Sequence, residues 1–233
     1  MAASIILTVL GAVFLTLFCL VRDENSSVKA LLLKTLTSVC FVLAGLFGIS
    51  NGAALPAGAL IVSGLLFGLI GDVLLDLKFI DKPNADMYTY GGMGSFLVGH
   101  IFYITALFLV FDLTVGGSLI SAGITLVLAA AVVVTTLKVM KYDYGKFLVP
   151  AAIYSVLLIF FTVLSVYALI RVGGTAAVLF TIGSVLFLLS DVILSMTYFG
   201  GKKGLVYLVT NHTTYYAAQF LIALAVCFIP VLG

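Results

Sequence analysis

Charged residues are scarce in this sequence: only 9% of its 233 residues are Asp, Glu, Lys or Arg. A soluble domain has about 25% charged residues, so the composition leaves almost no room for one. The net charge of +2 carries no information about nucleic acid, and no basic patch with interleaved aromatic residues is present. The chain is therefore expected to function in a membrane and not on a nucleic acid.

Several signatures of nucleophilic and metal-dependent hydrolysis are also missing. The sequence has no G-x-S-x-G elbow, no H-E-x-x-H zinc signature and no Cys near a His. Its three cysteines, Cys19, Cys40 and Cys227, are scattered through apolar runs, which favours small core residues over a disulfide or metal set. The first apolar run lacks a basic n-region and a small-residue cleavage site, so we predict a first span and not a signal peptide.

Long apolar runs recur instead along the whole chain, and 64% of the residues are hydrophobic. Each run is long enough to cross a bilayer as a helix. We predict an all-α polytopic membrane protein with a single transmembrane domain over residues 1–233. Its eight transmembrane helices are expected at about 3–21, 30–49, 57–77, 92–111, 118–138, 147–169, 174–197 and 205–230.

The basic residues gather at alternate connections of this eight-span pattern. Ten of the eleven Lys and Arg residues lie in or beside the first, third, fifth and seventh connections, and only Arg171 lies on the opposite side. By the positive-inside rule those four connections are cytoplasmic and both termini are non-cytoplasmic. The expected location is a bacterial inner membrane or an endoplasmic reticulum.

Four polar residues inside the spans share a common depth. Asp72 and Asp191 lie about six residues from the cytoplasmic ends of their spans, and His100 and His212 lie seven or eight residues into theirs. At about 1.5 Å per residue, all four are roughly 9–12 Å from the inner boundary. Buried carboxylates in hydrocarbon are costly and typical of functional sites, so we predict one polar pocket in the cytoplasmic half.

Helical spacing adds further residues to this set. Asp76 shares a helix face with Asp72 but is one turn nearer the cytoplasm, where we expect it to reach water and pair with Lys78 or Lys82. Tyr103 follows His100 at i+3. In the last span a polar stripe is expected to face the bundle interior or a water-filled cavity, and it consists of His212, Tyr215, Tyr216 and Gln219.

A faint internal repeat relates two segments. "GLLFGLIGDVLLDL" (64–77) aligns without gaps to "GSVLFLLSDVILSM" (183–196), matching Asp72 with Asp191, and each following span contains His-x-x-Tyr. This pattern is compatible with two parallel four-helix halves that meet at the pocket. The glycines Gly64 and Gly68 form a small-residue motif that we interpret as a helix-packing face.

Two carboxylates in one apolar pocket suggest acid–base chemistry. They cannot easily both ionise in a low-dielectric site, so one tends to hold a proton while the other stays charged. Such a pair suits hydrolysis through an oxocarbenium-like intermediate. Two alternatives stay open: a metal held by the two Asp and two His residues, and a proton-coupled transporter that uses the same intramembrane set.

Four motifs resemble the lysoplasmalogenase (YhhN-like) family of integral membrane hydrolases. They are "LIGDVLLDL", "FLVGHIFYI", "LFLLSDVIL" and "TTYYAAQFLIALA", and the resemblance extends from about the second span to the last. It implies cleavage of the vinyl ether bond of lysoplasmalogens to a fatty aldehyde and glycerophosphocholine or glycerophosphoethanolamine. The implied partners are a lysophospholipid substrate and membrane lipids, with no nucleic acid and no cofactor.

Roles for the polar residues follow from this resemblance together with the chemistry of vinyl ethers. Asp72 and Asp191 are predicted to be catalytic, one as general acid and the other as the group that stabilises the cation and activates water. His100, His212 and Tyr103 are expected to support them or relay protons. The predicted substrate-binding residues are Asp76, Tyr215, Tyr216 and Gln219, and four lysines at the rim, Lys78, Lys82, Lys202 and Lys203, are expected mainly to set topology.

Overall fold

The computed structural model describes residues 1–22, 28–50 and 55–229, and all regular structure in these ranges is helical, with no strand. The long helices are α1 Ala2–Val21, α2 Val28–Ser50, α3 Leu55–Ile80, α4 Ala85–Phe111, α5 Val115–Val134, α6 Leu148–Arg171, α7 Gly174–Tyr198 and α8 Leu205–Ala225. Short turns of 3₁₀ helix occur at Lys82–Asn84, Gly145–Phe147 and Val226–Phe228, and a π-helical turn extends α5 over Thr135–Val139.

This architecture confirms the predicted all-α polytopic membrane protein. Within the described ranges, seven helices, α1 to α7, are long and apolar enough to cross a bilayer. Helix α8 coincides with the predicted last span but is not one of the seven, and it contains the polar stripe. The count of eight spans therefore stays a prediction, and its final residue, 230, lies outside the described residues.

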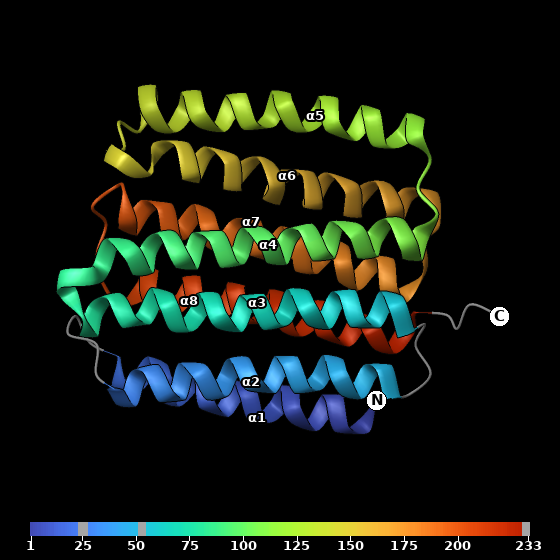
Figure 1. Cartoon of the computed structure of the whole chain (residues 1–233), viewed down its shortest axis with the longest axis horizontal. Coiled ribbons are helices and arrows are strands. Elements are labelled where there is room, and N and C mark those ends of the chain that lie inside the picture. Colours follow the sequence, from blue (N-terminus) through green and yellow to red (C-terminus); the bar gives the residue numbers. More distant parts are fainter. Residues whose placement is uncertain (23–27, 51–54, 230–233) are drawn as a thin grey trace.

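The long helices lie side by side along one common direction (Figure 1). Sequence neighbours pack against each other, α4 packs on α6, and α8 packs against α1, α2, α3 and α7. Helix α5 lies at one edge of the bundle, where α6 is its main neighbour. The start of α1 and the end of α8 lie at the same end of the bundle, as the alternating topology requires (Figure 1).

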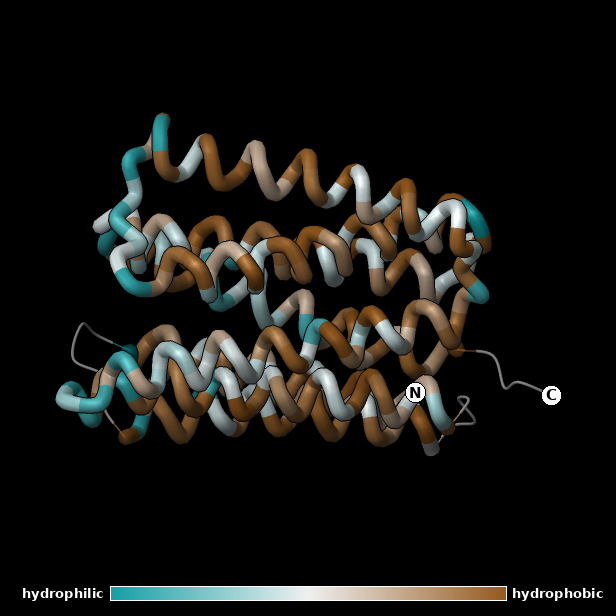
Figure 2. Tube along the Cα trace, turned by 45° about the horizontal axis from the view of Figure 1, so that its top comes forward, coloured by the Kyte–Doolittle hydropathy of each residue, from teal (hydrophilic) through white to brown (hydrophobic). Residues whose placement is uncertain are grey.

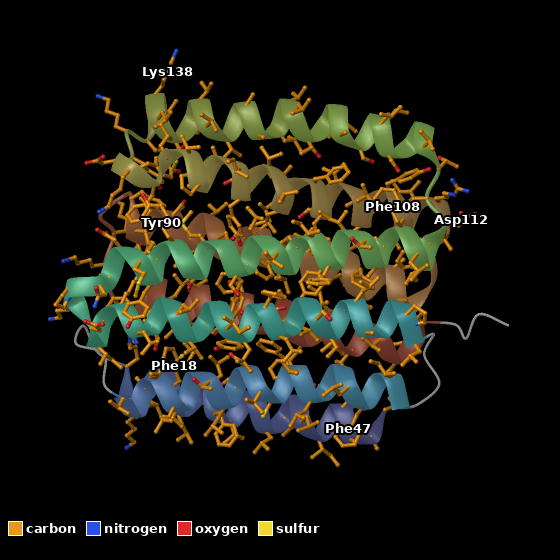
Figure 3. All side chains as sticks on the ribbon, viewed as in Figure 1. Phe18, Phe47, Tyr90, Phe108, Asp112 and Lys138 are labelled. Atoms are coloured by element: carbon orange, nitrogen blue, oxygen red, sulfur yellow. The ribbon has the colours of Figure 1, made fainter. Side chains whose placement is uncertain are left out.

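The bundle is apolar along its length and polar at its ends (Figure 2). Helix α5 exposes large apolar side chains, among them Val115, Leu119 and Val127, which are 77%, 68% and 70% exposed. Exposed apolar surface on this scale is costly in water and fits contact with lipid. Figure 3 shows the same contrast for single residues, because Phe18 is fully buried inside the bundle whereas Asp112 lies at its end.

The helix ends follow from local sequence. Pro56 and Pro150 lie in the first turns of α3 and α6, where a missing N–H removes no intrahelical hydrogen bond. The Thr114 side chain accepts a hydrogen bond from the Gly117 N–H at 3.3 Å and so caps α5. Gly204 precedes α8 with φ of +120°, a conformation that side chains disfavour, which fixes the turn from α7.

Glycines on one face of α3 let neighbouring side chains reach its backbone. Gly64 makes room for the ring of Tyr103, and Gly68 for the amide of Gln219, whose Nε2 would lie 2.5 Å from an added Cβ. The packing role predicted for Gly64 and Gly68 is therefore what the structure shows. If α1–α4 and α5–α8 are the two predicted halves, the packing of α4 on α6 corresponds to the packing of α8 on α2. The internal duplication itself stays a prediction.

Candidate active site

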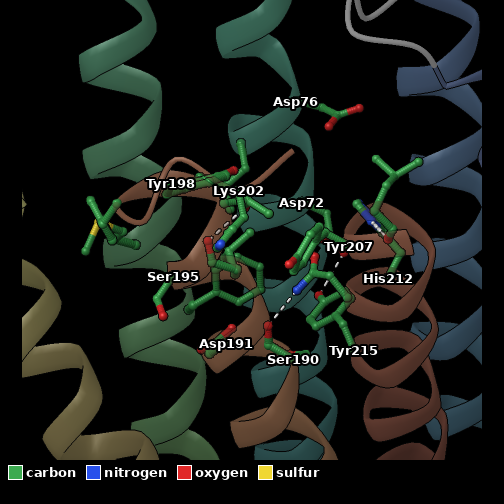
Figure 4. Close-up of a pocket in the computed structure, with 18 of the residues that line it drawn as sticks. Asp72, Asp76, Ser190, Asp191, Ser195, Tyr198, Lys202, Tyr207, His212 and Tyr215 are labelled. Carbon is green, nitrogen blue, oxygen red and sulfur yellow. Dashed lines mark hydrogen bonds between the residues drawn. The ribbon is translucent and has the colours of Figure 1, made fainter. Parts of the chain in front are cut away.

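A cavity of about 710 Å³ lies between the helices and holds both predicted aspartates. Asp72 comes from α3 and Asp191 from α7, and α2, α4, α6 and α8 complete its walls. Lys202, Lys203 and Tyr144 also line it, so the cavity reaches the bundle end where α7 connects to α8. Figure 4 shows Asp191 and Ser195 on one side of this space and His212 on the other.

Asp72 is buried, with 2% of its surface exposed, and has several polar neighbours. The Tyr215 hydroxyl of α8 donates to Asp72 Oδ2 at 2.8 Å, and the Ser38 hydroxyl of α2 donates to the same oxygen at 2.7 Å. Lys34 Nζ, also from α2, lies 3.6 Å from Asp72 Oδ1. Hydrogen bonds and a nearby cation both stabilise the charged form of a carboxyl group.

Asp76 differs from the prediction, because it is buried and its ion-pair partners are not Lys78 or Lys82. It is only 2% exposed and forms ion pairs with Arg22 Nη1 at 3.0 Å and Lys34 Nζ at 3.4 Å. The Lys78 ammonium instead lies 3.4 Å from the centroid of the Tyr198 ring. Asp76 lines the cavity, but the neighbouring helices leave it almost unexposed although it is near the helix end, and a charge so placed needs a partner.

Asp191 has a different environment from Asp72. Its carboxyl accepts a hydrogen bond from the Tyr154 hydroxyl of α6. The neighbouring Ser190 carbonyl accepts from Asn211 Nδ2 of α8 at 2.6 Å, which ties α7 to α8 beside the carboxyl group. In the described part of the chain, no Lys, Arg or His nitrogen lies within 4.0 Å of Asp191.

The two predicted histidines occupy unlike positions. His212 lines the cavity, donates from Nδ1 to the Leu208 carbonyl at 2.8 Å and packs on Phe18 with ring centroids 4.8 Å apart. His100 does not line the cavity and donates from Nδ1 to the Phe96 carbonyl at 2.7 Å. Its Nε2 has no hydrogen-bond partner among the described residues, and aromatic rings surround it.

A hydrogen-bonded chain lies behind the cavity wall and ends on Asp72. Tyr103 donates to Gln219 Oε1 at 2.8 Å, Gln219 Nε2 donates to the Tyr215 hydroxyl at 3.1 Å, and Tyr215 donates to Asp72. Tyr216 is not a member of this chain, but its hydroxyl lies 3.1 Å from Ser38 Oγ, which donates to Asp72. Neither Tyr103, Tyr216 nor Gln219 lines the cavity, so the structure connects Tyr103 and Gln219 to Asp72 through other side chains.

A family model matches residues 29–226, which is most of the chain. The chain belongs to the YhhN family. This family includes lysoplasmalogenases, and the match confirms the resemblance carried by the four sequence motifs. Comparisons with curated proteins and with solved structures gave no match.

The site of this YhhN family member contains two residues, Lys34 and Tyr154, that the sequence motifs do not include. In the sequence, Lys34 is one of the ten basic residues in or beside the alternate connections, and Tyr154 lies inside an apolar run. A signal for Lys34 was available, since Lys34 and Ser38 share one face of α2 at i and i+4, as Asp72 and Asp76 do on α3. The contact between these faces depends on how α2 packs on α3, which spacing alone does not show.

A metal site would need several His, Cys, Asp or Glu side chains close together. In residues 1–22, 28–50 and 55–229, no three His, Cys, Asp or Glu side chains come together in a way that could hold one. Asp72 and Asp76 instead have Lys34 between them, and His100 has its Nδ1 engaged and its ring enclosed. The described side chains therefore do not fit the metal alternative.

Proposed function

We propose that this YhhN family member hydrolyses the vinyl ether bond of lysoplasmalogens and releases a fatty aldehyde and glycerophosphocholine or glycerophosphoethanolamine. The observation that supports this most is the pair of aspartates, Asp72 and Asp191, that line one cavity between α3 and α7. Family membership supports membrane hydrolase activity and does not favour the transporter alternative.

The chemistry needs one proton donor and one anion in the same cavity. A general acid protonates the β-carbon of the vinyl ether, the electrons of the double bond form the new C–H bond, and the α-carbon and ether oxygen share an oxocarbenium charge. Water attacks the α-carbon and loses a proton, and the hemiacetal collapses to aldehyde and alcohol. Two carboxyl groups supply the acid and the stabilising anion, as they do in glycoside hydrolysis.

The walls of the cavity match the parts of a lysophospholipid. Apolar side chains, including Leu75, Phe96 and Phe187, line it near the aspartates and would contact the hydrocarbon chain. Lys202 and Lys203 line it at the bundle end and would face the phosphate. A volume of about 710 Å³ is within the range that small-molecule ligands occupy. We further propose that this end is cytoplasmic, because the basic residues gather there.

To test this proposal, a 1-alkenyl lysophospholipid is added to the purified protein in detergent or vesicles, and aldehyde release is measured. We expect turnover with this substrate and none with the saturated alkyl-ether analogue, which cannot form the cation by protonation at carbon. Asp72→Asn and Asp191→Asn should each lower kcat by about 10²-fold or more, the contribution typical of a positioned acid or base.

Asp112→Asn is the matched control for these variants. Asp112 is exposed and caps α4 in the left-handed conformation, with φ of +43°, which Asn adopts readily. It should therefore retain wild-type turnover. Near-normal aldehyde release by either Asp72→Asn or Asp191→Asn would refute the two-carboxylate mechanism.

A further inference from the structure

The two aspartates that the internal repeat matches have unlike partners. Each takes a polar neighbour from the helix that precedes its own: Lys34 of α2 approaches Asp72 of α3, and Tyr154 of α6 donates to Asp191 of α7. The first partner is a cation and the second is a neutral phenol. Two carboxyl groups in corresponding positions are thus exposed to different electrostatic fields.

Among the described residues, Asp72 belongs to a buried cluster in which Lys34 and Arg22 contact the carboxyl groups of Asp72 and Asp76. Lys34 Nζ lies between the two carboxylates, 3.6 Å from Asp72 Oδ1 and 3.4 Å from Asp76 Oδ1. Arg22 Nη1 also lies 3.0 Å from Asp76 Oδ2, so Asp76 has a second cation beside it while Lys34 lies near Asp72 as well. The Lys34 side chain is only 7% exposed, and an ion pair shielded from water is screened little by salt.

Among the described residues, Asp191 has hydrogen-bond partners beside it but no Lys, Arg or His nitrogen within 4.0 Å. Tyr154 donates to it, and Asn211 holds the adjacent Ser190 carbonyl. The cations of the cluster, Arg22 and Lys34, are engaged with Asp72 and Asp76. An isolated carboxylate in an apolar site is expensive, and the group avoids that cost by keeping its proton.

We propose that Lys34 and Tyr154 give the two aspartates opposite roles: Lys34 keeps Asp72 charged, and Asp191 holds the proton and delivers it to the vinyl ether. Asp191 then becomes a carboxylate that Tyr154 stabilises by its hydrogen bond, while Asp72 faces the oxocarbenium charge. Water attacks the cation and returns its proton to Asp191, which restores the starting state. Lys34 and Tyr154 are positioning residues, since they act through the aspartates.

The catalytic roles of Asp72 and Asp191 rest on the proposed function, but infrared spectroscopy tests separately which of the two holds the proton. The purified protein in phosphatidylcholine vesicles is compared with its variants in the stretching band of a protonated carboxyl group. We expect this band to contain a component that Asp191→Asn removes and Asp72→Asn leaves in place. Asp112→Asn, at an exposed carboxyl group, should leave the band unchanged.

Lys34 is tested by removing and by restoring its charge. Lys34→Met leaves Asp72 without its cation while Asp76 keeps Arg22, so a second protonated-carboxyl component should appear, and Lys34→Met combined with Asp72→Asn should lack it. Lys34→Arg should give the wild-type spectrum. With the alkenyl substrate, Lys34→Met should lower kcat by about 10²-fold and Lys34→Arg should recover most of it.

The outcomes separate the two proposals. A band component lost in Asp72→Asn and kept in Asp191→Asn would reverse the assignment and overturn it. Absence of the second component in folded Lys34→Met would refute the role of Lys34, and if that variant does not fold, the comparison of the two Asp→Asn variants still decides where the proton lies. Absence of aldehyde release by the wild-type protein would contradict the proposed function while the infrared result stands.

Discussion

Adding one methyl group at Gly68 should disturb the hydrogen-bonded chain that ends on Asp72. In Gly68→Ala the new Cβ would lie 2.5 Å from Gln219 Nε2, about 1 Å closer than an ordinary contact. The Gln219 amide holds Tyr103 at 2.8 Å and Tyr215 at 3.1 Å, so a shift of about 1 Å breaks at least one of these bonds.

The expected change in the free energy of unfolding follows from these contacts. Overpacking costs about 1–3 kcal/mol. A lost neutral hydrogen bond adds about 0.5–1.5 kcal/mol. The gain of Ala over Gly within a helix offsets about 1 kcal/mol of this. We therefore expect Gly68→Ala to lower the free energy of unfolding by about 0.5–3.5 kcal/mol and, because Tyr215 orients Asp72, to lower kcat as well.

The assay is denaturant-induced unfolding in detergent micelles, followed by circular dichroism, together with aldehyde release. Gly94→Ala is the matched control, since nothing in the described chain lies within 4 Å of its added Cβ, and it should be neutral or stabilising by about 0.5–1 kcal/mol. In a Gln219→Ala background the methyl group has room, so Gly68→Ala should cost nothing there. An equal cost in both backgrounds would refute the steric reasoning.

Three further predictions concern the buried cations, an aromatic contact and the cavity mouth. Lys34→Met should destabilise the protein by about 3–5 kcal/mol, because it breaks the buried ion pairs of Lys34 with Asp72 and Asp76. Lys146→Met, which removes a largely exposed ion pair, should change stability by less than about 1 kcal/mol, and equal effects in the same unfolding assay would contradict the buried cluster. Phe18→Ala removes a fully buried ring that packs on His212 and should lower the free energy of unfolding by about 3–5 kcal/mol in the same assay. An unchanged free energy of unfolding would show that this contact is dispensable. Lys202→Gln combined with Lys203→Gln should raise KM for the lysolipid several-fold at low salt with little change in kcat, and an unchanged KM would argue against phosphate contact at the mouth.

The polar residues of the spans show how far sequence reasoning reaches. Asp72 and Asp191 stood out because carboxyl groups are rare in apolar runs, and their common depth predicted a shared cavity, which the structure has. The position of Asp76 along its own span predicts that it reaches water. Its exposure is decided by the neighbouring helices, which bury it and supply Arg22 and Lys34.

Composition and periodicity alone determined the class of this protein, because in a bilayer every backbone polar group must be satisfied within the chain, and long apolar helices are the simplest way to do so. The motifs alone indicated the family. Only the tertiary structure decided which side chains meet: Lys34 with Asp72, Tyr154 with Asp191, and Tyr103 with Gln219. These contacts join residues 37 to 116 positions apart, and they depend on the rotation and packing of helices about which a single span carries no information.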